Sequence, residues 1–356
     1  MKILHIITSL QLGGAETLVA NLLTRFHDEG HEVGVVVFNG KQTELMERLE
    51  RECPSCKIYR LGNSYYNPWY IFKLVRIMRN YDIIHTHNSS PQLYAAIANL
   101  LCRKKLVTTE HSTNNRKREQ GGILRMIDKW MYRQYDKIIC ISKIAEEKLS
   151  SYLGNNTYDN ICTIDNGVDV EAFQQAKPIE GLRSNKFSIV MVAGFREAKD
   201  QDTLICAMSL LLRNEYELWL VGDGVRREIL EELVKDLHIE DSVKFLGFRS
   251  DVPNILKSAD TVVMSSHWEG LSLSNIEGMA VGKPFIASDV PGLREVTKDA
   301  GILFPKGDAK ALANIIQLLS NDPVYYKQIA DQCYARAQQY DIKKTVTEYL
   351  QVYLHL

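Results

Sequence analysis

The chain has 356 residues, more than the ~250 to 300 at which a single hydrophobic core stops growing, so we expect two domains. Hydrophobic residues account for 45% of the chain and charged residues for 24%, which excludes a disordered or collagen-like protein. The net charge of -1 at pH 7 argues against a nucleic-acid-binding protein, whose surface would be strongly basic.

Short apolar runs alternate with longer amphipathic segments, and this alternation predicts two parallel α/β domains. Unbroken apolar runs are typical of strands that helices cover on both faces. The polar stretch QQAKPIEGLRSNK separates the two halves. We expect an N-terminal domain at 1–170, a C-terminal domain at 171–340, and a helix at 341–356 that packs back toward the N-terminal domain. The predicted strands are KILHIIT, EVGVVVF, DIIHTH, KLVTTEH and KIICIS, then FSIVMVAGF, YELWLVGDG, SVKFLGF, TVVMSS and PFIAS.

The first predicted strand lies in MKILHIITSL, which continues into QLGGAE without the small-residue cleavage site of a secretory signal. No stretch approaches ~18 unbroken apolar residues, so we expect no membrane-spanning helix. Seven cysteines scattered over a long chain suit reduced thiols. These features predict a cytoplasmic protein.

Loops after the predicted strands carry the polar residues of interest, because ligands of open α/β sheets bind at the carboxyl ends of strands. GGAE follows the first strand, although an ordinary strand-to-helix turn explains it equally well. His85 and His87 end a later strand, where we expect structural roles and only one side chain pointing into a cleft. His111 ends the next strand, and there we favour a functional role.

Residues 101–137 form a basic segment, with ten lysines and arginines against four acidic residues, a net charge of +6. One interpretation is a solvated helix face. The other is a patch that rests on anionic lipid at the inner face of the membrane, with Trp130 and Tyr132 nearby.

Two motifs have the composition of metal sites, and we expect neither to bind a metal. Cys53 and Cys56 form a lone CxxC without the second Cys or His pair of a zinc site. Asp200 and Asp202 form a D-x-D, but they follow Lys199 and open a predicted helix, where acidic residues are favourable.

The segment SSHWEGLSLSNIEGMAVGKP contains two carboxylates, Glu269 and Glu277. On one helix they would lie about 80° apart and about 12 Å along the axis, so they are not a facing pair. Gly270 breaks the run after Glu269, and SNIEGMA predicts a helix that begins at or just before Ser274. Glu277 then either completes an S-x-x-E capping box with Ser274 or binds a ribose, on a helix whose N-terminus binds phosphate.

These residues, continued through PFIASDVPGLREV, resemble the E-x7-E signature of retaining glycosyltransferases of family 4, of the type found in bacterial polysaccharide biosynthesis. The resemblance spans nearly the whole chain. It implies the α/β GT-B architecture, in which two Rossmann-like domains with parallel sheets face each other across a cleft and bind the acceptor and the donor respectively. The other matching segments are GGAE, DIIHTH, TEH, NGVDVEAF, AGFREAKDQDTLICA, LWLVGDG, VKFLGFRSDVPNILKSADTVVMSS and GILFPKGD.

The resemblance also implies roles for individual residues. The residue matching Glu277 binds the donor ribose, and the one matching Glu269 lies beside the transferred sugar. Lys199 matches a lysine that neutralises the departing diphosphate, and His111 matches a histidine that approaches the sugar. Further contacts with the donor are expected from Gly13, Gly14, Gly270, Leu271, Ser272, Leu273, Ser274, Phe248 and Arg249.

Two positions depart from the family pattern. Gly194 stands where an arginine usually accompanies the lysine, and Arg196 follows two residues later. We expect Arg196 to replace the missing arginine, the alternative being a solvated residue or a pair with Glu197. Gly278 replaces the usual alanine after the second glutamate, at a cost to the helix of roughly 0.5 to 1 kcal/mol.

We therefore predict a retaining hexosyltransferase that needs no metal or cofactor. It would move a sugar from a nucleotide diphosphate, most simply a UDP-sugar, to a hydroxyl of a glycan or polyprenyl-linked acceptor. Two alternatives stay open at this point: a sugar-nucleotide epimerase of the same architecture, and a non-catalytic protein that binds nucleotide-sugars.

Overall fold

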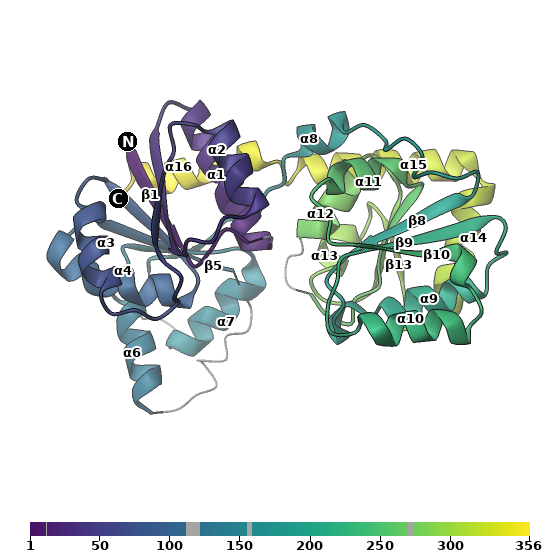
Figure 1. The fold of residues 1–356 in the computed structure, drawn as a ribbon, viewed down its shortest axis with the longest axis horizontal. Helices are drawn as coiled ribbons and strands as arrows, with labels where there is room; N and C mark the ends of the chain where they lie inside the picture. Colours follow the sequence, from purple (N-terminus) through teal and green to yellow (C-terminus); the bar gives the residue numbers. More distant parts are fainter. Residues whose placement is uncertain (12, 112–121, 155–158, 270–272) are drawn as a thin grey trace. The chain divides into compact units, whose positions relative to one another are not determined.

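The computed structural model describes the whole chain except residues 12, 112–121, 155–158 and 270–272 (Figure 1). The chain divides into two units, unit 1 with Met1–Gly167 and Ile342–Leu356, and unit 2 with Val168–Asp341. The predicted boundaries lay at 170/171 and 340/341. The last helix, α16 (Ile342–Leu354), belongs to unit 1 and packs against α1 (Gly14–Asp28).

Unit 1 is built on a parallel sheet of strand order β3-β2-β1-β4-β5-β6-β7. Its strands are β1 (Lys2–Ile7), β2 (Glu32–Asn39), β3 (Lys57–Gly62), β4 (Ile83–His87), β5 (Lys105–Glu110), β6 (Lys137–Cys140) and β7 (Ile161–Thr163). One core lies between the sheet and α1, α2 (Glu44–Glu52) and α16. A second core lies under α3 (Tyr70–Met78), α4 (Ser89–Cys102), α6 (Ile123–Tyr132) and α7 (Lys143–Leu153).

Unit 2 has a parallel sheet of order β10-β9-β8-β11-β12-β13. Its strands are β8 (Phe187–Val192), β9 (Tyr216–Val221), β10 (Val243–Gly247), β11 (Thr261–Met264), β12 (Phe285–Ser288) and β13 (Ile302–Phe304). The helices are α8 (Val170–Gln175), α9 (Gln201–Ser209), α10 (Arg227–Asp236), α11 (Val252–Ser258), α12 (Leu273–Ala280), α13 (Arg294–Thr297), α14 (Ala309–Asn321) and α15 (Pro323–Gln338).

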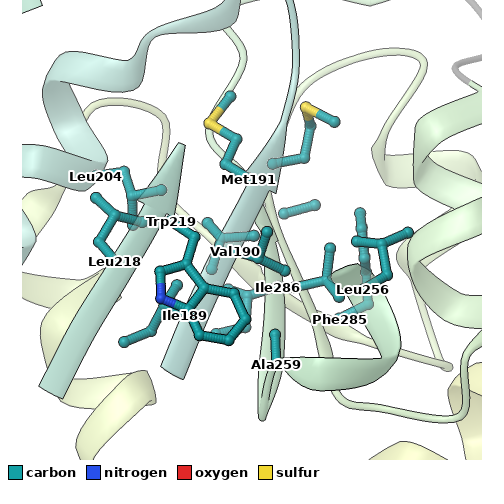
Figure 2. Close-up of a cluster of buried hydrophobic side chains, with 14 of the residues drawn as sticks. Ile189, Val190, Met191, Leu204, Leu218, Trp219, Leu256, Ala259, Phe285 and Ile286 are labelled. Atoms are coloured by element: carbon teal, nitrogen blue, oxygen red, sulfur yellow. The ribbon is translucent and has the colours of Figure 1, made fainter. Parts of the chain in front are cut away.

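The core of unit 2 is formed by side chains from the central strands. Figure 2 shows Val190 of β8, Trp219 of β9 and Phe285 of β12 in one buried cluster. Phe285 also explains Gly278, because a Cβ at position 278 would lie 2.7 Å from the Phe285 ring. Such a contact is closer than real Cβ atoms make. The glycine therefore provides the space that a packed core requires for the aromatic ring.

Each sheet reverses its strand order once, between β1 and β4 in unit 1 and between β8 and β11 in unit 2. Ligands of open α/β sheets bind outside the carboxyl ends of the strands at such switch points. All the predicted strands form. Within the described part of the chain, no helix is long and apolar enough to cross a membrane.

Candidate active site

Two of the predicted catalytic residues meet at the switch point of unit 2. Lys199 ends a 3₁₀ turn (Glu197–Lys199) that follows β8, and Glu269 lies in the loop after β11. Lys199 Nζ donates to Glu269 Oε1 at 2.5 Å, and Ser266 Oγ donates to the same oxygen at 2.7 Å. The side chains are 24% and 10% exposed respectively. A largely desolvated ammonium therefore stands at the strand end, oriented by a carboxylate.

Hydrogen bonds hold the Lys199 turn against the end of β11. Ser265 Oγ donates to the Asp200 carbonyl at 2.7 Å, and the His267 N–H donates to the Ala198 carbonyl at 2.8 Å. Ser265 is fully buried. These contacts tie the two loops together on either side of the ion pair, so the ammonium is positioned before any ligand arrives.

Glu277 lies farther into α12 than the capping-box interpretation requires. The helix begins at Leu273, so Ser274 already occupies a helical position and cannot serve as the N-cap of a capping box with Glu277. The Glu277 carboxylate has no hydrogen-bond or ion-pair partner among the described residues. Burial raises its pKa to about 7. An unpartnered, half-buried carboxylate is available to a ligand that brings hydroxyl groups.

The remaining donor-binding predictions in unit 2 fall into two groups. Leu273 and Ser274 form the start of α12, whereas Gly270, Leu271 and Ser272 lie outside the described residues. Phe248 and Arg249 follow the edge strand β10; Phe248 is 72% exposed, and Arg249 pairs with Asp251. The described contacts do not join Phe248 or Arg249 to the Lys199–Glu269 pair.

Arg196 reaches back over the position of the missing family arginine. It is exposed and forms no ion pair with Glu197 or any other described residue. Its Nε lies 3.9 Å from the place where a Cβ would stand at Gly194. The guanidinium nitrogen Nε would therefore be in van der Waals contact with a β-carbon at position 194.

The D-x-D acidic residues are both engaged by the chain itself. Asp200 is the N-cap of α9, where its side chain accepts from the Thr203 N–H. Asp202 accepts two hydrogen bonds from the Arg226 guanidinium at 2.8 and 2.9 Å. Both carboxylates therefore stabilise the local structure, Asp200 as a helix cap and Asp202 as the partner of Arg226.

In unit 1, histidines gather at the switch point. His85 and His87 of β4 stack with ring centroids 4.5 Å apart, and both are fully buried. The expectation that only one would point toward a cleft was wrong, because residues two apart on a strand share a face. His111, after β5, lies 2.8 Å from His87 through its Nε2 and the His87 Nδ1. Burial lowers the pKa of His111 to about 4, so the ring is neutral.

The glycine turn after β1 is shaped by Glu16. Gly14 begins α1, and a Cβ at Gly13 would collide with the Glu16 carboxylate. Glu16 is hydrogen-bonded to Asn88, and burial raises the pKa of its carboxyl. Asn88 adopts φ 69° and ψ 153°, a strained conformation for a residue with a side chain. Neither residue was predicted from the sequence; Asn88 directly follows the His85-Thr86-His87 stretch, which was the available signal.

The fold matches a solved structure over its full length. The match to the crystal structure of Anabaena Alr3699/HepE in complex with UDP-glucose covers 100% of both chains, with a TM-score of 0.84 and 23% identity. Two parallel α/β units, each with polar residues at the switch point of its sheet, and this full-length match together show the GT-B fold. This confirms the predicted fold class.

Sequence comparisons identify the family of the chain. A model described as Glycosyl transferases group 1 matches residues 172–339, and one described as Glycosyltransferase Family 4 matches residues 12–172. The putative glycosyltransferase EpsD of Bacillus subtilis (strain 168) is 30% identical over 77% of this chain and 76% of its own. The N-acetyl-alpha-D-glucosaminyl L-malate synthase of Bacillus anthracis is 26% identical over 96% of this chain and 94% of its own. The chain belongs to the family 4 glycosyltransferases, as the sequence predicted.

Proposed function

We propose that this glycosyltransferase is retaining and metal-independent, that it takes its sugar from a UDP-sugar, and that the acceptor is a hydroxyl of a glycan or polyprenyl-linked molecule. The observation that carries the donor assignment is the Glu277 carboxylate, half-buried and without a partner among the described residues. The complex of Anabaena Alr3699/HepE with UDP-glucose supports the same donor class.

The proposed reaction breaks the bond between the anomeric carbon and the diphosphate oxygen and forms a bond to the acceptor oxygen. The acceptor proton passes to the departing phosphate. Lys199, assisted by Arg196 and the start of α12, stabilises the negative charge that develops on the leaving group. Glu269 is held by Lys199 and Ser266, so its assigned role is to orient the ammonium beside the sugar.

Retention follows if the acceptor attacks from the face that the nucleotide leaves. Gly13 and Gly14 are assigned to the donor phosphates, and His111 to the sugar. A product with an inverted anomeric carbon, read from the NMR coupling of its anomeric proton, would contradict this mechanism.

Donor affinity should depend on the ionisation of Glu277. Ribose hydroxyls donate to the carboxylate form, so binding favours ionisation of a group whose pKa is about 7 in the free protein. Affinity for UDP-glucose is expected to be about tenfold weaker at pH ~6 than at pH ~8. UDP-glucose lacks the terminal phosphate ionisation near pH ~6, so the ligand keeps its charge. Titration calorimetry of the wild type across this range measures the effect.

Glu277→Gln separates this proposal from a purely structural role. The variant should bind UDP-glucose about tenfold more weakly at pH ~8, with no pH dependence, because a neutral amide is a weaker acceptor than a carboxylate. The folded-state pKa of Glu277 is raised, so its contribution to stability falls as pH rises through about 7. The variant should therefore melt no lower than the wild type at pH ~8. Unchanged affinity with a lower melting temperature would refute the donor role.

We also propose that unit 1 contacts anionic membranes through α6. Ile123, Leu124 and Met126 are 75%, 57% and 72% exposed, and Arg125 lies among them. Apolar residues interspersed with basic ones suit a helix that lies in the lipid interface. Tyr132 does not take part, because it is fully buried with its hydroxyl donating to Glu110. Arg116, Lys117 and Arg118 of the basic segment lie outside the described residues.

Vesicle pelleting tests the α6 surface. The wild type should pellet with phosphatidylglycerol vesicles and not with phosphatidylcholine, and ~1 M salt should release it because the Debye length falls to ~3 Å. Met126→Glu should reduce binding at low salt. Val324→Glu, at a residue 79% exposed in unit 2, is the matched control and should bind as the wild type does. Equal pelleting with both lipids would contradict the proposal.

A further inference from the structure

His5, His87 and His111 form a hydrogen-bonded chain at the switch point of the unit 1 sheet. His5 Nδ1 lies 2.9 Å from His87 Nε2, and His87 Nδ1 lies 2.8 Å from His111 Nε2. His5 and His87 are fully buried, and burial lowers the pKa of all three rings. A neutral imidazole carries one N–H and one acceptor nitrogen. Each of the two hydrogen bonds therefore has a single donor. The ring nitrogen that carries the proton in His5 then determines which nitrogen carries it in His87 and in His111.

His5, at one end of this series of hydrogen bonds, decides the direction in which each histidine donates. His5 Nε2 is buried and has no hydrogen-bond partner among the described residues. A buried N–H without an acceptor is rarer in proteins than an under-satisfied acceptor. The His5 proton therefore belongs on Nδ1, from which it donates to His87 Nε2. His87 must then be protonated on Nδ1, and it donates to His111 Nε2.

We propose that His5 and His87 are positioning residues that hold His111 in the tautomer with its proton on Nδ1. His111 Nε2 is then occupied as an acceptor, and Nδ1, without a partner among the described residues, is presented as an N–H donor. This inference rests on the proposed function and deepens it. The ligand group that His111 recognises is an oxygen acceptor of the sugar, and His111 does not take up the acceptor proton through Nδ1.

The same cluster has a second interpretation, a metal site. Ligand nitrogens of His5, His85 and His87 all lie within 4.8 Å of one another. His5 Nδ1 and His87 Nε2 are only 2.9 Å apart and share one proton, so these two nitrogens face each other and not a common metal position. His85 also uses both nitrogens, toward the Tyr353 hydroxyl at 2.5 Å and the Thr109 hydroxyl at 2.8 Å. These hydrogen bonds favour the interpretation as a hydrogen-bonded relay of His5, His87 and His111 over a metal site.

Nitrogen NMR of ¹⁵N-histidine-labelled protein tests the relay directly, because protonated and bare ring nitrogens differ widely in chemical shift. The His111 signals are assigned by comparison with His111→Gln. In the wild type, His111 should show a protonated Nδ1 and a bare Nε2, and added Zn²⁺ should leave the His5 and His87 signals unchanged. A protonated His111 Nε2, or zinc-dependent shifts of His5 and His87, would overturn the proposal.

Variants of His5 test its control over His111. His5→Phe keeps an aromatic ring in the stack and removes the donor, so His111 should populate both tautomers and kcat should fall about tenfold, with KM for the donor within about twofold. His5→Asn places an amide donor near the Nδ1 position and should restore most of the loss. Tyr353→Phe removes the hydroxyl that binds His85, breaks no relay contact, and should leave the His111 signals unchanged.

The His111 tautomer seen by NMR and the sugar-transfer activity test the histidine relay and the proposed function separately. The predicted His111 tautomer without any sugar transfer would leave the relay standing and refute the proposed function. Sugar transfer together with the opposite tautomer would refute the relay alone. Should His5→Phe fail to fold, the wild-type spectrum and His5→Asn still decide the matter.

Discussion

Lys199→Ala is expected to lower kcat/KM for sugar transfer by about 100-fold or more, which would be the largest loss from any single side chain in the site. The departing diphosphate carries concentrated negative charge, and Lys199 is the ammonium held at the switch point of unit 2. Removing it takes away a charge-assisted contact that strengthens as the leaving group departs. Steady-state kinetics should therefore show the loss in kcat as well as in kcat/KM.

Lys244→Ala is the matched control for that experiment. Lys244 Nζ lies 2.9 Å from Glu217 Oε2, and the Glu217 side chain is 3% exposed, so this pair also joins a lysine to a buried glutamate within unit 2. Both residues lie near the amino ends of their strands, away from the switch-point loops. Lys244→Ala should lower the melting temperature and leave kcat within about twofold of the wild type. Equal kinetic losses in the two variants would show that Lys199 acts through stability alone.

Of the strands predicted from the sequence, all except β10 lie inside their sheets, with a neighbouring strand on each side. The runs KILHIIT and FSIVMVAGF are nearly continuous in apolar residues because β1 and β8 lie at the centres of their sheets. The strands β3, β7 and β13 were not predicted, and each is an edge strand whose residues are mostly half-buried or exposed. An edge strand needs no unbroken apolar run, so its pattern resembles that of a loop.

The site was predictable where the family motif is local in sequence, and less so where pairing between distant strands creates it. Lys199 and Glu269 lie at strand ends that the motifs mark, and the structure joins them. The histidine cluster depends on the register that sets His5 beside His85, 80 residues away, which no local pattern reveals. The helix start at Leu273 agrees with the expected start at or just before Ser274, and it places Ser274 inside the helix, which removes the capping-box interpretation of Glu277.

The second large effect is expected at Arg196. An arginine presents a planar fork that two phosphate oxygens can share, whereas a lysine is a compact point charge. Arg196 is exposed, has no ion-pair partner among the described residues, and lies over Gly194. Arg196→Ala should lose a charge-assisted contact of roughly 1.5 to 3 kcal/mol in the transition state, a fall of about 10- to 100-fold in kcat/KM. Arg213→Ala, at an exposed arginine outside the site, is the control and should retain full activity.

A second substitution distinguishes the position of the guanidinium from a general effect of lost charge. A Cβ at Gly194 would lie 3.8 Å from the Asp223 carbonyl oxygen, which is ordinary van der Waals contact, so a β-carbon fits there. Gly194→Arg in the Arg196→Ala background returns the arginine to the usual family position, and it should recover most of the lost kcat/KM. Recovery would mean that Arg196 reaches the same phosphate oxygens from two residues farther along the chain. Activity of Arg196→Ala within about twofold of the wild type, with Lys199→Ala inactive, would instead show that Lys199 and the start of α12 stabilise the leaving diphosphate without an arginine.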